Sequence, residues 1–216
     1  MAAILASTAT FNSQNFHYYC DLLAARESMF ATIIRNHGYP PFWSRQQGFE
    51  TLIHIILEQQ VSLASALAAY SKLKQKLLVI TPASLLSLSD EDLKNCYFSR
   101  QKIIYTKHLA SCIISGKIVI EDLENKSNET IALHLQQVKG IGKWTSDVYL
   151  MMALHRTDCF PIGDIALINS MKYELQLDKL STSEILLDRA EKWRPYRTIA
   201  AYLLWHAYLQ RRIKVK

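Results

Sequence analysis

Apolar residues recur along this chain at the spacing of helices. One run places apolar side chains at i, i+3, i+4 and i+7, namely at Phe49, Leu52, Ile53 and Ile56. Such a run is typical of a helix with one buried face. No sustained alternation of apolar and polar residues indicates a sheet, and only six glycines and five prolines interrupt the chain. The chain is therefore predicted to be all-α.

Cap and turn residues set the expected helix limits. Helices are expected to end at Gly38 and Gly116, and to begin after Ser89 and at the capping-box pattern Ser181-x-x-Glu184. The pattern as a whole predicts helices near residues 18–37, 48–77, 83–88, 90–96, 99–115, 129–137, 144–155, 164–175, 182–193 and 196–212.

The length and composition narrow the class of protein. A chain of 216 residues can bury a sizeable core, as one compact unit or as two small lobes around a cleft. We expect a flexible N-terminus over residues 1–17 and a folded domain over residues 18–216. No apolar run approaches the roughly 18 residues of a membrane-spanning helix. The four cysteines are too scattered for a zinc site or an iron–sulfur cluster built from them alone.

The charge is consistent with an anionic partner. Lys and Arg number 25 against 19 Asp and Glu, a formal net charge of +6. A basic excess of this size agrees with binding to a polyanion such as nucleic acid but does not establish it.

The most informative stretch begins with a glycine turn. Gly140-Ile141-Gly142 lies between Lys139 and Lys143, at the start of a predicted helix. Glycine permits positive φ and a close backbone approach, and the amides that open a helix favour an anion such as a phosphate. The alternative to such an anion-binding turn is an ordinary turn between two helices.

A single carboxylate follows this helix. The break Pro161-Ile162-Gly163 is followed by Asp164, and an aspartate in this position most often caps a helix. Asp147 and Asp158 are competing carboxylates, and we expect both to be solvated.

Several runs together resemble a known superfamily. The runs that resemble the helix-hairpin-helix and Gly/Pro…Asp signature of the DNA glycosylases are VKGIGKWTSDVYLMMAL at residues 138–154 and FPIGDIAL at residues 160–167. Residues 55–62 are similar to the ILxQQxS helix of the 3-methyladenine DNA glycosylase II branch, and residues 193–205 to its WxPxRxxAAxxLW helix. The resemblance spans about residues 18 to 212 in the same order.

This resemblance implies a two-lobed, all-α fold with an active-site cleft between the lobes. It also implies a base excision repair enzyme that flips an alkylated purine out of duplex DNA and hydrolyses its N-glycosidic bond. The expected substrate is 3-methyladenine, with 7-methylguanine as a further candidate. Asp164 matches the catalytic aspartate, which would stabilise the oxocarbenium-like sugar and orient or deprotonate the attacking water.

The resemblance also assigns residues to the base pocket. Trp144 and Trp205 match pocket aromatics, whose indole faces attract the positive charge of an alkylated purine. Gln59 and Tyr196 are further pocket candidates, Tyr196 the weaker one. Lyase-competent relatives carry a lysine at the place of Trp144, and a tryptophan cannot form a Schiff base. The chain is therefore expected to be a monofunctional hydrolase.

The remaining assignments concern DNA and a cation. The expected DNA contacts are Gln60, Lys139, Gly140, Gly142, Lys143 and Thr145. Gln60 would fill the gap left by the flipped base, although the wedge is apolar in some relatives. The hairpin of this family can bind a monovalent cation through carbonyl oxygens, here those of Gln136, Val138 and Ile141. No other cofactor is expected.

Two other functions remain open from the sequence. One is a non-catalytic helix-hairpin-helix DNA-binding protein, and the other is a glycosylase for oxidised bases, with or without lyase activity. In every case the expected partner is double-stranded DNA and not a membrane. We expect a monomer, located in the cytoplasm and nucleoid of a bacterium or in the nucleus of a eukaryote.

Overall fold

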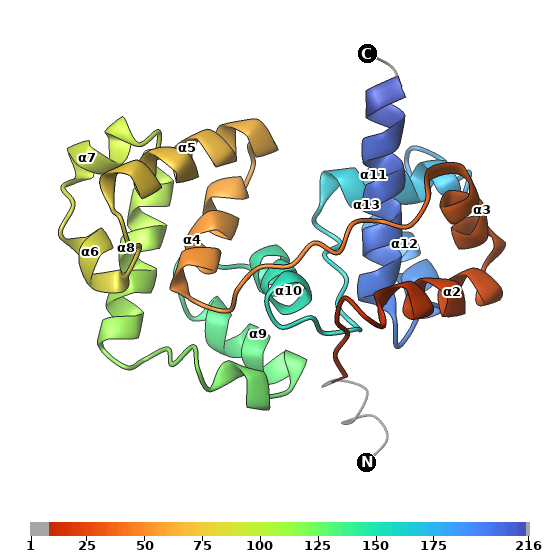
Figure 1. Ribbon diagram of the computed structural model, residues 1–216, viewed down its shortest axis with the longest axis horizontal. Coiled ribbons are helices and arrows are strands. Elements are labelled where there is room, and N and C mark those ends of the chain that lie inside the picture. The colour runs from red at the N-terminus through yellow and green to blue at the C-terminus, as the bar shows by residue number, and fades with distance from the viewer. Residues whose placement is uncertain (1–8, 215–216) are drawn as a thin grey trace. The chain divides into compact units, whose positions relative to one another are not determined.

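The structure, a computed structural model, describes residues 9–214. Those residues form helices and one isolated β-bridge, between Thr10 and Arg156, so the predicted all-α class is confirmed (Figure 1). No helix of the described part of the chain is long and apolar enough to cross a membrane.

The chain divides into two compact units. Unit 1 comprises residues 1–44 and 150–216, and unit 2 comprises residues 45–149. The helices of unit 1 are α2 (Phe16–Arg26), α3 (Ser28–His37), α11 (Ile165–Glu174), α12 (Ser183–Glu191) and α13 (Arg197–Lys214). Unit 2 holds α4 (Phe49–Glu58), α5 (Leu63–Lys76), α6 (Pro82–Leu86), α7 (Asp90–Asn95), α8 (Arg100–Ile114), the 3-10 turn η1 (Leu123–Asn125) and α9 (Asn128–Gln136). Helix α10 (Lys143–Met152) begins in unit 2 and ends in unit 1.

Helix α13 is the centre of unit 1. It packs against α2, α3 and α11, which surround the blue helix in Figure 1. Residues 198–207 are all buried as a result. Three alanines of this run, Ala200, Ala201 and Ala207, leave room for the close approach of neighbouring helices. The long α13 therefore provides a rigid base for side chains such as Trp205.

Helices α4 and α8 organise unit 2. Residues 51–53 and 55–57 of α4 are buried, because α5 packs against one side of this helix and α8 against another. Helix α8 also contacts α6 and α7, so it touches most of the unit. The apolar face predicted from Phe49 to Ile56 is thus confirmed as core.

Two predicted long helices are wrong, because each is two helices. The predicted helix 18–37 breaks at Glu27, whose backbone is extended (φ −137°, ψ 112°). The predicted helix 48–77 breaks after Glu58, where Gln60 takes a left-handed conformation with φ of 56°. A new helix then begins at the cap Ser62, whose side chain accepts a hydrogen bond from the Ser65 amide. This second break leaves Gln60 exposed on a loop.

The predicted N-cap residue is correct for α7 and is wrong by one residue for α12. Ser89 caps α7 in a capping box with Asp92, as expected. Helix α12 is capped by Thr182 and not by Ser181, and the Thr182 side chain accepts from the Ile185 amide. Neighbouring serine and threonine residues can both cap, so the pattern alone did not choose between them.

Part of the expected flexible N-terminus is packed. Residues 1–8 lie outside the described residues, but Phe11 and Phe16 are buried in unit 1. The Phe11 amide donates to the His155 carbonyl at 3.0 Å, and the Phe11 ring lies edge-on to that of Tyr202. The folded domain therefore begins before residue 18.

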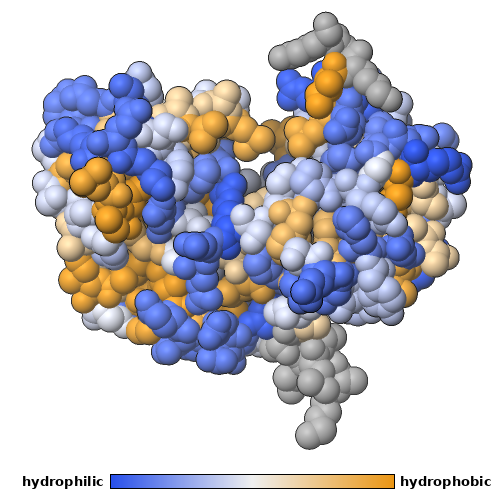
Figure 2. All heavy atoms as spheres, viewed as in Figure 1, coloured by the Kyte–Doolittle hydropathy of each residue, from blue (hydrophilic) through white to orange (hydrophobic). Residues whose placement is uncertain are grey.

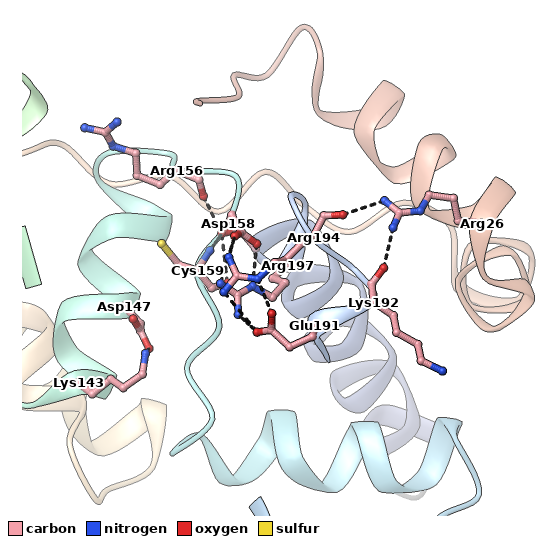
Figure 3. A network of polar contacts seen from close by, with 11 residues as sticks. Arg26, Lys143, Asp147, Arg156, Asp158, Cys159, Glu191, Lys192, Arg194 and Arg197 are labelled. Atoms are coloured by element: carbon pink, nitrogen blue, oxygen red, sulfur yellow. Dashed lines mark hydrogen bonds and ion pairs between the residues drawn. The ribbon is translucent and has the colours of Figure 1, made fainter. Parts of the chain in front are cut away.

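Asp158 is buried and paired, which corrects the expectation that it is solvated. Its carboxylate accepts hydrogen bonds from Arg194 at 2.6 Å and from Arg197 at 2.7 Å (Figure 3). Glu191 binds the same two arginines, and Arg26 of α2 donates to the Lys192 and Arg194 carbonyls. A buried carboxylate needs such partners, because an unpaired charge is costly away from water. This network joins elements of unit 1 and has a structural role.

Candidate functional site

A tight turn connects α9 to α10 in unit 2. Gly140 has φ of 90°, a conformation that side chains rarely adopt. A Cβ atom at this position would overlap the ring of Tyr105 on α8. Gly140 is therefore required by its conformation and by its packing.

Two further side chains hold the turn from outside. The amide of Lys139 donates to Nδ1 of His108 at 2.9 Å. Gln59 donates through Nε2 to the Gly140 carbonyl and to Oγ1 of Thr145, both at 2.8 Å. The turn is thus fixed to α8 and to the end of α4, independently of any ligand.

Gly142 has a different environment. Its φ is not in the positive range, and a Cβ atom there would meet nothing within 4 Å. Its carbonyl accepts from the Ser146 amide, as expected for the residue that directly precedes α10. Nothing inside the protein requires a glycine at this exposed position, so the missing side chain leaves space for a partner outside it.

The two lysines of the turn are exposed. Nζ of Lys143 binds Oδ2 of Asp147 at 2.7 Å, one helical turn along α10. Asp147 is buried, at 5% exposure, which again corrects the expectation of a solvated carboxylate. Lys143 therefore already has an anionic partner in unit 2, while Lys139 lies on the turn itself.

The loop between α4 and α5 carries the predicted DNA-contacting glutamine. Gln60 is exposed, whereas Gln59 is half-buried and donates its two amide hydrogens to the hairpin. Val61 and Leu63 are exposed at 44% and 65%. Figure 2 shows apolar surface over the start of α5, beside this loop. The loop thus presents one amide next to two exposed apolar side chains.

Asp164 begins helix α11 in unit 1. Its Oδ1 accepts from the Leu167 amide at 2.9 Å, so the residue is an N-cap. The same oxygen accepts from Nε1 of Trp205 at 3.1 Å. The positive end of the α11 dipole and these two donors all favour a negative charge at this place. The structure therefore brings together two of the predicted site residues, Asp164 and Trp205.

Other aromatic rings pack against Trp205, the residue that donates to Asp164. Trp43 lies edge-on to the rings of Trp205 and Tyr202, with centroids 6.4 and 5.4 Å away. Tyr202 is fully buried, and its hydroxyl donates to the Trp43 carbonyl at 2.7 Å. Trp43 is half-buried.

The contacts described for the other predicted pocket residues do not include Asp164 or Trp205. Trp144 is half-buried in the first turn of α10. Tyr196 is half-buried in unit 1, and its ring lies 5.1 Å from that of Tyr19. Gln59 contacts the hairpin instead of presenting its amide NH2 to a pocket.

The carbonyls predicted to bind a cation lie at the end of α9 and in the turn. Gln136 is the last residue of α9, where helix carbonyls lack intrahelical partners and carry the negative end of the dipole. The Val138 carbonyl accepts from the Ile141 amide at 3.0 Å and retains a second lone pair. Such oxygen donors fit a hard monovalent cation.

Sequence reasoning missed three residues of these sites. Tyr105 and His108 support the turn, and Trp43 packs beside Trp205. Tyr105 and His108 stand three residues apart on α8, as neighbours on a helix face do. No pattern in the sequence connects that face to a turn more than thirty residues away.

The chain is similar in sequence to known DNA repair proteins. Residues 53–195 match the family model "HhH-GPD superfamily base excision DNA repair protein". Over 165 residues, the chain is 33% identical to DNA-3-methyladenine glycosylase 1 of Schizosaccharomyces pombe, covering 74% of this chain and 72% of that protein.

Two solved structures are similar in fold. The S. pombe 3-methyladenine DNA glycosylase in complex with abasic DNA aligns with a TM-score of 0.80 at 30% identity, covering 87% of this chain and 95% of that one. A DNA-3-methyladenine glycosidase of Bacillus halodurans aligns with a TM-score of 0.72 at 29% identity, covering 88% of each chain.

The two glycines of the turn should respond differently to alanine. Gly140→Ala is expected to lower the free energy of unfolding by roughly 1–3 kcal/mol, from its left-handed backbone and the overlap with Tyr105. Gly142→Ala should lower this free energy by less than about 1 kcal/mol, because space surrounds its Cβ and only the preference for glycine over alanine before a helix is lost. Urea unfolding of both variants measures the difference, and equal losses would contradict it.

Proposed function

The chain belongs to the HhH-GPD superfamily of base excision DNA repair proteins and is a DNA glycosylase, and we propose that it hydrolyses the N-glycosidic bond of alkylated purines in duplex DNA. The preferred base is 3-methyladenine, and 7-methylguanine is a second substrate. The observation that carries this proposal is the Asp164 carboxylate at the start of α11, which accepts a hydrogen bond from Trp205 and lies within the matched residues 53–195.

The proposed reaction is a hydrolysis at the sugar. The enzyme flips the damaged nucleotide out of the duplex, at a cost of a few kcal/mol. The bond between C1′ and the base nitrogen breaks, and its electron pair leaves with the base. The negative charge of Asp164 stabilises the oxocarbenium-like sugar and orients a water molecule. The alkylated base carries a positive charge before the bond breaks, so it leaves as a neutral molecule. The water oxygen bonds to C1′, and the proton that this water loses passes to Asp164 and then to solvent.

The aromatic group of unit 1 supports a cationic substrate. Alkylation places positive charge on a purine, and indole faces attract cations by about 0.5–2 kcal/mol. The Trp205 indole donates to the Asp164 carboxylate, and the half-buried Trp43 lies beside Trp205. Such attraction is modest, which suffices because an alkylated base is already a good leaving group.

The hairpin is proposed to hold the DNA backbone. Amides at the start of α10 and the exposed Lys139 would contact phosphates, and Gly142 would allow the backbone to come close. Contacts of this kind bind any sequence, as a repair enzyme that searches DNA requires. The protein is proposed to act as a monomer on duplex DNA.

The geometry around Trp144 favours a monofunctional enzyme. A lyase needs an amine that attacks C1′, and Trp144 has none. The neighbouring Lys143 amine is held by Asp147 at 2.7 Å. We therefore propose base release without strand cleavage, and the same argument disfavours an oxidised-base glycosylase with lyase activity.

A monovalent cation is proposed at the hairpin. The carbonyls of Gln136, Val138 and Ile141 would hold it, and its charge would attract a DNA phosphate.

Asp164→Asn should abolish release of 3-methyladenine while leaving affinity for duplex DNA within about twofold. Asparagine caps helices as well as aspartate and can still accept from Trp205, so the variant loses mainly the negative charge. Chromatography of bases released from methylated DNA measures the change. Retained excision would refute the catalytic role, whereas a wild type that binds DNA without releasing any base would indicate a non-catalytic DNA-binding protein.

Borohydride should trap no covalent complex between the wild type and alkylated DNA. Reduction captures a Schiff base, which requires an attacking amine. Denaturing electrophoresis detects the adduct, with a known lyase on its own substrate as the positive control. The variant Trp144→Lys tests the position directly, and an adduct with the wild type would contradict the monofunctional assignment.

Replacing K⁺ by tetramethylammonium at equal ionic strength should weaken binding to undamaged duplex DNA several-fold if carbonyls hold the cation. The bulky ion matches the screening of K⁺ but is too large for a site of three carbonyls. Fluorescence anisotropy of a labelled duplex measures affinity in the two salts. Equal affinities would exclude a role for the cation.

A further inference from the structure

Gln59 joins the two parts of unit 2 that are proposed to contact DNA. Its Nε2 donates to the Gly140 carbonyl and to the Thr145 hydroxyl, each at 2.8 Å. A carbonyl oxygen only accepts, so the amide nitrogen must face the hairpin. Both hydrogens of this NH2 group are therefore used within the protein. Gln59 directly precedes Gln60, the exposed residue of the α4–α5 loop.

One face of α8 supports the same two parts. The residues Lys102, Tyr105 and His108 follow one another at three-residue spacing on this helix. Lys102 donates through Nζ to the Leu57 carbonyl at 2.5 Å, near the end of α4. Partial burial of this amine lowers the pKa of Lys102. Tyr105 and His108 hold the hairpin at Gly140 and Lys139.

These contacts connect the loop to the hairpin by two routes. One route is direct, through the Gln59 side chain, and the other runs through α8. The backbone of this loop is unusual at Gln60, which is left-handed with φ of 56°, directly after the extended Gln59. A loop with this conformation needs such external contacts to keep one geometry.

We propose that Gln59 is a positioning residue that fixes the Gln60 loop in register with the hairpin, so that insertion of the loop into DNA and the grip on the phosphates occur as one event. This inference rests on the proposed function in taking damaged duplex DNA as the ligand, and on the sequence-based expectation that Gln60 fills the gap left by the flipped base. It replaces the sequence-based expectation that Gln59 contacts the flipped base. Gln59 touches no reacting atom in this role and acts through Gln60 and Gly140.

Binding to abasic DNA separates positioning from base contact. A duplex with a tetrahydrofuran abasic site has no base to enter a pocket, but it still offers a gap for the loop. Loss of a pocket residue should leave this affinity unchanged. Loss of a positioning residue should weaken it, because the loop no longer meets the gap when the hairpin holds the phosphates.

The test compares Gln59→Leu with the matched control Gln47→Leu. Gln47 is also a half-buried glutamine of unit 2, and its Nε2 donates to the Ile120 carbonyl at 2.7 Å, outside the hairpin and the α4–α5 loop. Gln59→Leu should weaken binding to the abasic duplex about tenfold, while Gln47→Leu changes it less than about twofold. Affinity for undamaged duplex should stay within about threefold for both.

A second readout reports the loop itself. A 2-aminopurine opposite the abasic site should change its fluorescence when the wild type inserts its loop, and Gln59→Leu should reduce this signal at saturating protein. The isosteric Gln59→Glu, which cannot donate to the Gly140 carbonyl, should behave like Gln59→Leu and serves if the leucine variant does not fold. The double variant Gln59→Leu/Thr145→Val should lose less binding free energy for the abasic duplex than the two single variants lose in sum.

The outcomes are decisive for this residue. Unchanged binding of Gln59→Leu or Gln59→Glu to the abasic duplex, or an equal loss for Gln47→Leu, would overturn the proposal. None of these measurements requires base release. A wild type that releases no alkylated base would therefore refute the proposed function and leave the result for Gln59 standing.

Discussion

The structure of unit 2 depends on the left-handed turn at Gly140. A side chain here would collide with Tyr105, so the hairpin can lie against α8 only because position 140 has no Cβ atom. This contact lets the Lys139 amide reach His108 and the Gly140 carbonyl reach Gln59. The hairpin is therefore formed before any DNA binds, and little conformational entropy remains to be lost on binding.

Asp164 combines a structural role with a proposed chemical role on one carboxylate. An N-cap must accept a backbone hydrogen bond, and a catalytic carboxylate must hold its charge toward the sugar. Trp205 shares Oδ1 with the Leu167 amide, so the orientation of the carboxylate is set by α11 and α13 together. Removing only the charge is therefore the clean way to separate the two roles, because the cap and the indole bond both tolerate an amide.

How much of this follows from the sequence depends on how local each feature is. The glycine turn, the Asp164 cap and most helices come from residues close together in the chain, and they were predictable. The break at Gln60 was partly readable, because Ser62 can cap a new helix, but the apolar spacing continued across it. The buried state of Asp158 was not predictable, since its partners Arg194 and Arg197 lie more than thirty residues away.

The electrostatics of the hairpin limit what its lysines contribute. Lys143 is paired with Asp147, a buried carboxylate, so moving its amine to a DNA phosphate would exchange one ion pair for another. The net gain from such an exchange is small, because the carboxylate loses a cation where water is scarce. In the proposed complex, attraction to DNA would then come mainly from helix amides and from lysines such as Lys139. The backbone amides are already fixed in direction, so they lose no side-chain conformational entropy when they bind a phosphate. The proposed hold on DNA therefore depends on the shape of the turn more than on the net charge of +6.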